Sequence, residues 1–142
     1  MPSLDEEHLN GLCKEILQLD NSIRFAGITN NLGSLVATAY RACLIPLMDN
    51  QETSHYAIQA VLRAATREDF ESKIGRLEYS IGKYERLIRA TIPIRLSSSK
   101  EDDESKFYYL LLSFDLNSNV MDLIENKIIP FIQKIKSRSY SL

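Results

Sequence analysis

Residues 23–41 read IRFAGITNNLGSLVATAYR, and the fold of the whole chain follows from this stretch. Both of its ends are rich in β-branched, aromatic and small apolar residues, a composition that favours strands. Its centre is Asn30-Asn31-Leu32-Gly33. Asparagine tolerates positive φ and glycine adopts it without steric cost, so these residues are typical of a tight turn. The stretch therefore predicts a β-hairpin with strands over Ile23–Ile28 and Leu35–Tyr40. A helix over Leu35–Cys43 is the alternative, since its alanines suit either state.

Helical patterns flank this hairpin. Apolar side chains recur at three- and four-residue intervals between Ser3 and Leu19, as in an amphipathic helix. A second helix is expected from about Glu52 to Arg67, and its apolar residues are distributed around most of the circumference of the helix. A helix of this kind is buried on more than one face, so we expect one face on the sheet and another against either a neighbouring segment or a second copy of the chain. The alternative is that its alanines simply favour helix formation.

Three more strands are expected after the second helix. Apolar and polar residues alternate over Ile74–Ile81 and again over Leu87–Leu96, which is typical of half-buried strands. Phe107–Phe114 reads FYYLLLSF and is apolar on both faces, which is typical of a strand in the middle of a sheet. The polar residues 97–105 should form the loop between the last two strands.

A final helix is expected from about Asn119 to Lys136. Pro130 removes one helical hydrogen bond, so the helix should kink near Asn126. Residues 137–142 are expected to be disordered.

These elements predict an α+β fold in a single domain over residues 1–142. Their order is helix, two strands, helix, three strands, helix. The two most apolar strands should lie in the middle of a five-stranded antiparallel sheet, which gives the strand order 2-1-5-4-3. Helices should cover both faces of this sheet.

Composition excludes several classes of protein. The chain has 142 residues, is 44% hydrophobic and 25% charged, and carries a net charge of −2. This charge gives no support for binding nucleic acid. No run of eighteen apolar residues could span a membrane, and the acidic, polar start of the chain is unlike a secretory signal. We therefore expect a cytoplasmic protein with no membrane association.

No catalytic, cofactor or metal motif is present, so the sequence predicts that the chain is not an enzyme. The two histidines, His8 and His55, have no recognisable nucleophile or orienting group beside them. The five glycines form no phosphate-binding loop. Cys13 and Cys43 form no disulfide framework or metal pattern, and Cys13 is expected to be a small buried hydrophobe.

The order of elements resembles the roadblock/LC7 group within the wider profilin-like and longin-like architecture. In more detail, IRFAGITNNLGSLVATAYR followed by LIPLM, a helix, IGRLEYSIGKYERLIRATIPI and YYLLLSFD is similar to a set of small archaeal proteins, notably from ammonia-oxidising archaea. This resemblance covers nearly the whole chain. Its motifs are core and turn residues, so it speaks for the fold more than for the function.

The resemblance implies a non-catalytic interaction module that forms a homodimer. We expect no cofactor, because the sequence has no cofactor motif. Roadblock relatives often pair their third strand and second helix across a two-fold axis, and they commonly bind small GTPases or act as scaffolds. No residue that contacts a GTPase can be assigned here. The residues expected at the dimer interface, from the second helix and the third strand, are Tyr56, Ala60, Arg63, Ala64, Arg67, Leu77, Tyr79 and Ile81.

A ligand sensor of the PAS or GAF kind is the alternative, because such domains share the strand order 2-1-5-4-3. In that class a small molecule would lie between the sheet and a helix, lined by Tyr40, Tyr79 and Tyr108. PAS domains usually carry several helices between strands 2 and 3, whereas this chain offers one.

Overall fold

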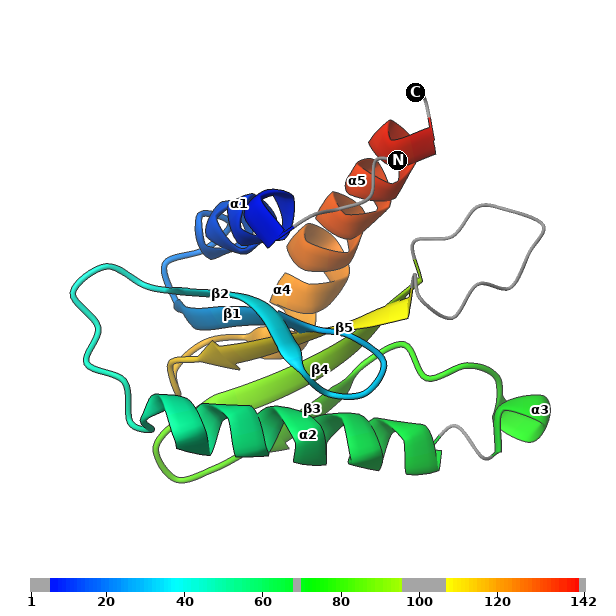
Figure 1. Ribbon diagram of the computed structural model, residues 1–142, viewed down its shortest axis with the longest axis horizontal. Coiled ribbons are helices and arrows are strands. Elements are labelled where there is room, and N and C mark those ends of the chain that lie inside the picture. Colours follow the sequence, from blue (N-terminus) through cyan, green and yellow to red (C-terminus); the bar gives the residue numbers. More distant parts are fainter. Residues whose placement is uncertain (1–5, 68–69, 96–106, 141–142) are drawn as a thin grey trace.

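The centre of the sheet is an antiparallel pair of strands that are far apart in the sequence, Ile23–Thr29 (β1) and Phe107–Phe114 (β5). The computed structural model describes residues 6–67, 70–95 and 107–140. The strand order is β2-β1-β5-β4-β3 (Figure 1), which confirms the predicted topology and the α+β class. The strands are β1 (Ile23–Thr29), β2 (Leu35–Tyr40), β3 (Ser80–Lys83), β4 (Ile88–Arg95) and β5 (Phe107–Phe114).

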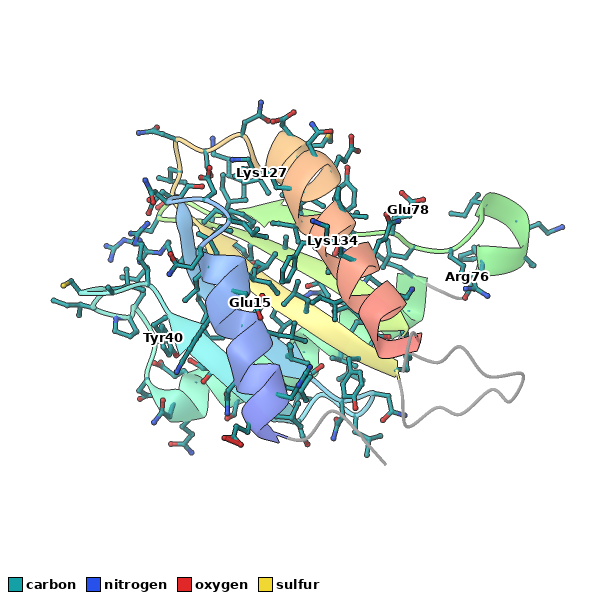
Figure 2. The ribbon with its side chains drawn as sticks, turned by 90° about the horizontal axis from the view of Figure 1, so that it is seen from above. Glu15, Tyr40, Arg76, Glu78, Lys127 and Lys134 are labelled. Atoms are coloured by element: carbon teal, nitrogen blue, oxygen red, sulfur yellow. The ribbon has the colours of Figure 1, made fainter. Side chains whose placement is uncertain are left out.

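Helices cover both faces of the sheet, as predicted. In Figure 1, α2 lies below the sheet, while α1 and α5 lie above it. Seen from above, α1 and α5 cross the sheet side by side, with Glu15 on α1 and Lys134 on α5 (Figure 2). The helices are α1 (Glu6–Leu17), α2 (Asn50–Arg67), α3 (Glu71–Ile74), α4 (Val120–Leu123), the π-helical turn η3 (Ile124–Ile128) and α5 (Ile129–Tyr140).

β5 supplies both cores because its side chains alternate between the two faces. Leu110, Leu112 and Phe114 pack into the larger core under α1 and α5. Tyr109 and Leu111 point the other way and pack into the smaller core against α2. All five are buried, which accounts for the absence of a polar face in this strand.

β1 contains a bulge that the sequence did not reveal. Strict alternation would place Ile23 and Phe25 on one face of the sheet. The pairing of β1 with β5 shifts register between these two residues. Ile23 therefore joins Ala26 and Ile28 in the larger core, while Phe25 packs in the smaller one. An extra residue in one strand of a pair has this effect.

The predicted hairpin turn is confirmed. The Asn30 side-chain oxygen accepts hydrogen bonds from the Leu32 N–H at 2.9 Å and from the Ser34 N–H at 3.1 Å. Gly33 has a φ of +90° and lies against α2. A Cβ at Gly33 would be 2.9 Å from the Ile58 Cα, so the turn and the helix can approach this closely only with glycine at the position.

The two edges of the sheet differ. β2 is the edge strand that packs against α1, and its Thr38 N–H donates to the Asn10 side-chain oxygen on that helix at 3.3 Å. β3 is the other edge, and no described strand or side chain pairs with its outer side. The edge at β2 is thus partly closed by a helix, while the edge at β3 is open.

The third strand is much shorter than the predicted Ile74–Ile81. α3 ends at Ile74, and only Ser80–Lys83 pairs with β4. In a strand, Leu77 and Tyr79 would share a face. Instead Leu77 packs against the smaller core and Tyr79 against the larger one. The Tyr79 hydroxyl donates to a carboxylate oxygen of Glu125, so a side-chain contact on the η3 turn holds this segment, and no strand ladder forms there.

The last helix departs from regular α-helix where a kink was predicted. Pro130 has no N–H, so the carbonyl of Asn126 loses its helical partner. The structure has the π-helical turn η3 over Ile124–Ile128, which includes Asn126. α5 then continues to Tyr140, so residues 137–140 are helical where the sequence suggested disorder. The predicted polar loop 97–105 and residues 141–142 lie outside the described residues.

The turn at Gly33 gives a test of how closely the hairpin packs on α2. We expect Gly33→Ala to destabilise the fold by about 2 kcal/mol, because alanine is strained at positive φ and its Cβ would meet the helix backbone. Urea unfolding of the purified variant measures this loss. Gly11→Ala is the matched control, since its Cβ meets nothing within 4 Å and alanine favours the interior of α1. It should stabilise by up to about 1 kcal/mol. Equal effects of the two changes would contradict the close approach.

Candidate protein interface

The outer side of α2 presents large aliphatic residues to solvent. Ile58 is 46% exposed and Leu62 is 62% exposed, and they stand one helical turn apart. Arg63 and Arg67 are also exposed and form no ion pair among the described residues. Ile58 and Leu62 share one face of the helix, which we call the α2 outer face, whereas the two arginines lie along a flank of the helix. An apolar centre bordered by charge is typical of a protein interface.

The residues that the sequence assigned to an interface fall into three groups. Tyr56, Ala60 and Ala64 are buried in the core between α2 and the sheet. Leu77 and Tyr79 are half-buried outside any strand. The remaining three, Arg63, Arg67 and Ile81, are exposed. The structure therefore places the two arginines one turn apart along a flank of α2, and Ile81 on the edge strand β3.

Ile58 and Leu62 were missing from the predicted interface, although the sequence carries a signal for them. Ala57, Ala60 and Ala64 recur at helical spacing and face the sheet, where they pack with Tyr109 in the smaller core. The large aliphatic residues of the same helix lie off this stripe. A helix with its alanines inside and its large aliphatic residues outside is a helix with an unpartnered apolar surface.

Asp115 at the end of β5 forms ion pairs with two arginines. Arg41 donates to it at 2.7 Å and Arg24 at 3.3 Å, so the ends of three neighbouring strands are joined. The hydrogen bond from Arg41, followed by that from Arg24, lowers the pKa of the Asp115 carboxyl below its ordinary value of 3.8. The same contact with Asp115 raises the pKa of Arg41.

The three tyrosines of the ligand-sensor alternative do not converge. Tyr40 borders a hollow of about 50 Å³ beside the segment that leads to α2. Tyr108 borders an apolar hollow of about 20 Å³ between α1 and α5. Tyr79 borders neither hollow, and its hydroxyl donates a hydrogen bond to Glu125 on the η3 turn. These two hollows are much smaller than the roughly 300–1,000 Å³ of small-molecule sites.

A larger hollow of about 530 Å³ lies between α5, β4 and residues 71–78. Its lining mixes charged groups of both signs with aliphatic ones: Glu71, Arg76, Leu77, Glu78, Ile92, Pro93, Ile94, Glu125, Ile129, Ile132, Gln133 and Lys136. Small-molecule sites are mostly apolar with a few placed polar groups, so this hollow does not favour the sensor reading.

Reactive side chains are scattered. His55 is exposed on α2, and a nitrogen of its ring lies 3.3 Å from the Gln59 amide nitrogen. Burial raises the pKa of the Cys13 thiol to about 12, which confirms the expected buried hydrophobe. Within the described ranges, no three histidine, cysteine or acidic side chains are grouped to hold a metal ion.

No helix in the described part of the chain is long and apolar enough to cross a membrane.

Strand order, the helices on both faces and the similar solved structures together define a roadblock/LC7-like fold. Myxococcus xanthus MglB matches with a TM-score of 0.69 at 12% identity, covering 99% of this chain and 94% of that one. An MglB structure with a tetrameric arrangement matches with a TM-score of 0.65 at 14% identity, covering 98% and 89%. A roadblock/LC7 domain from Streptomyces avermitilis matches with a TM-score of 0.64 at 9% identity, covering 91% and 95%.

No family model and no curated protein matches the sequence. At identities this low, likeness to the solved structures shows the fold alone. The similarity to archaeal proteins stays a prediction.

The Asp115 cluster gives a test by pH. The folded-state pKa of Asp115 is lowered, so its ion pairs stabilise the fold fully above about pH 4 and are lost as the pH falls through the folded-state value. We expect Asp115→Asn to cost up to about 1 kcal/mol at pH 7, since the carboxylate is partly exposed. The loss of stability between pH 5 and 2 should also become shallower in this variant.

Urea unfolding at several pH values measures both effects. Glu15→Gln is the control, because it removes an exposed carboxylate that makes no ion pair among the described residues. Asp20 also has a lowered pKa, through hydrogen bonds from Ser22, so part of the slope should remain in Asp115→Asn. An unchanged slope in that variant would show that the Asp115 ion pairs do not contribute.

Proposed function

We propose that this chain is a non-catalytic protein-interaction module that works as a homodimeric scaffold or regulator, with a small GTPase as its partner class. The observation that carries the proposal is the exposed apolar centre of α2, Ile58 and Leu62, in a domain whose sheet has an open edge at β3. A second copy of the chain offers the same two features, so a two-fold pair can cover both.

Two copies of α2 are complementary when they run antiparallel. If the helices cross midway between Ile58 and Leu62, the aliphatic side chains of the two copies pack on one another. Burying Leu62 contributes roughly 1.5–3 kcal/mol per copy.

β3 would contribute backbone hydrogen bonds to the same assembly. Its outer edge has no described partner, and Ile81 is exposed on it. An edge strand of this kind can pair with another strand and extend the sheet. The MglB structure with a tetrameric arrangement supports the general idea that domains of this fold associate. The small-GTPase partner and the cytoplasmic location rest on the resemblance to the roadblock group and on the composition.

The oligomeric state of Leu62→Asp tests the dimer. We expect the wild-type chain to be a dimer by native mass spectrometry at micromolar concentration, and Leu62→Asp to weaken it at least about tenfold, because an unpaired charge would be buried. Met121→Asp is the matched control, since Met121 is an exposed apolar residue on α4, across the sheet from α2. A monomeric wild-type chain, or a dimer that survives Leu62→Asp but not Met121→Asp, would contradict the proposal.

The GTPase partner is tested separately. Immobilised wild-type protein is expected to retain a small GTPase from a lysate of the source organism in a manner that depends on whether GDP or a non-hydrolysable GTP analogue is supplied. The purified GTPase should then hydrolyse GTP or release nucleotide at a different rate when the chain is added. A retained protein without any nucleotide dependence would favour the scaffold form over the GTPase regulator.

A further inference from the structure

The segment between β2 and α2, residues 41–49, has no regular structure and is unusually apolar at its surface. Ile45 is 84% exposed and Leu47 is 53% exposed. In Figure 1 this segment runs from the end of β2 at one side of the sheet to the beginning of α2. We call it the connector. Exposed aliphatic residues in a loop cost solubility unless they serve an interaction.

A hollow lies beneath the connector and has a mostly apolar wall. Leu44, Pro46, Leu47 and Met48 form its connector side, and Tyr40 borders it at the end of β2. In Figure 2, Tyr40 is seen at this side of the molecule, next to the connector. The volume is about 50 Å³, which suits one inserted side chain better than a whole small molecule.

Arg89 of β4 lies in this hollow and has no carboxylate partner among the described residues. Its guanidinium carbon is 3.7 Å from the centre of the Tyr56 ring and 5.5 Å from that of Tyr84. One of its nitrogens donates to the sulfur of Met48 at 3.1 Å, and a thioether is only a weak acceptor. Arg89 is therefore a half-buried cation that is held in place by an aromatic ring and still has donors to offer.

The nearby charges leave the hollow positive. Arg24 also lines it, and Arg24 and Arg41 share the single carboxylate of Asp115. The two acids at the end of the connector are engaged at the beginning of α2. The Asp49 carboxylate accepts from the Glu52 N–H at 2.8 Å, and the Glu52 carboxylate accepts from the Asp49 N–H at 3.0 Å. Their reciprocal hydrogen bonds are those of a capping box, so they do not neutralise Arg89.

We propose that the connector hollow is a docking site for an extended segment of a partner protein that carries an aspartate or glutamate next to a large apolar residue. The carboxylate would pair with the planar fork of Arg89, which matches two carboxylate oxygens. The apolar neighbour would pack on Leu44, Leu47 and Tyr40. One free guanidinium fits one carboxylate, whereas phosphate sites usually gather several free cations. This site is separate from the α2 outer face, so it goes beyond the proposed dimer.

A peptide selection on the full chain tests the docking site. A library of random twelve-residue peptides is panned against the purified protein, and an enriched sequence is made as a fluorescent peptide for anisotropy titration. We expect enriched peptides to carry Asp or Glu within two positions of Leu, Ile or Phe. We expect Arg89→Gln and Leu47→Ser each to weaken binding by about tenfold or more. Arg89→Lys should fall between wild type and Arg89→Gln, because it keeps the charge and loses the fork.

Two control variants separate this site from other surfaces. Arg86→Gln removes an exposed arginine in the β3–β4 turn, and Leu62→Asp alters the α2 outer face. Both should bind the peptide within about twofold of wild type. Thermal melts show whether Arg89→Gln is folded. If Arg89→Gln does not fold, Leu47→Ser still tests the site, because Leu47 is on the surface and its substitution should leave the fold intact.

Several results would overturn the proposal. They are the absence of any enriched peptide, enrichment without acidic residues, and affinity unchanged by Arg89→Gln and Leu47→Ser. Binding that Leu62→Asp abolishes would place the peptide on the dimer surface. Binding at least tenfold tighter to a phosphoserine version of the peptide would assign the hollow to phosphorylated partners. By contrast, if Leu62→Asp loses the dimer and still binds the peptide, the docking site is independent of the proposed dimer.

Discussion

β5 lies between β1 and β4, with helices above and below, so its side chains from Tyr109 to Phe114 are all buried. Leu112 and Leu111 are neighbours in the sequence and serve opposite cores. This double burial fixes the place of every other element. β1 and β4 must flank β5, and each face must be covered by a helix. The sheet supplies large side chains to the smaller core, and α2 faces them with three alanines beside Tyr56 and Val61.

The strand order was predictable because it depends on patterns that are local and strong. FYYLLLSF is apolar on both faces, which is typical of a central strand, and the turn residues Asn30–Gly33 favour a hairpin of neighbouring strands. The position of the irregular helix followed from the missing N–H of Pro130. Composition and the absence of motifs are likewise readable without coordinates. These features need no knowledge of which residues meet across the sheet.

Other features depend on partners distant in sequence, and here pattern reasoning was wrong or incomplete. Leu77 and Tyr79 alternate as in a strand, yet a tyrosine–carboxylate contact to Glu125, 46 residues away, holds this segment in another form. The bulge beside Ile23 reverses its face without any glycine or proline to announce it. The burial of Tyr56, Ala60 and Ala64 was hidden from the sequence for the same reason. The apolar content of α2 was clear, but which side meets the sheet depends on the bulk of the strands beneath it.

The two edges of the sheet have a consequence for stoichiometry. At β2, α1 packs along the strand and the Asn10 side-chain oxygen accepts a hydrogen bond from the Thr38 N–H. β3 has no such cover among the described residues. A subunit with one open edge can be joined through its sheet to one other subunit, and a two-fold pair consumes both open edges at once. Growth through strand pairing then ends at two copies. The packing of α1 along β2, with the 3.3 Å hydrogen bond from Thr38 to Asn10, thus favours a closed assembly over an unlimited fibre.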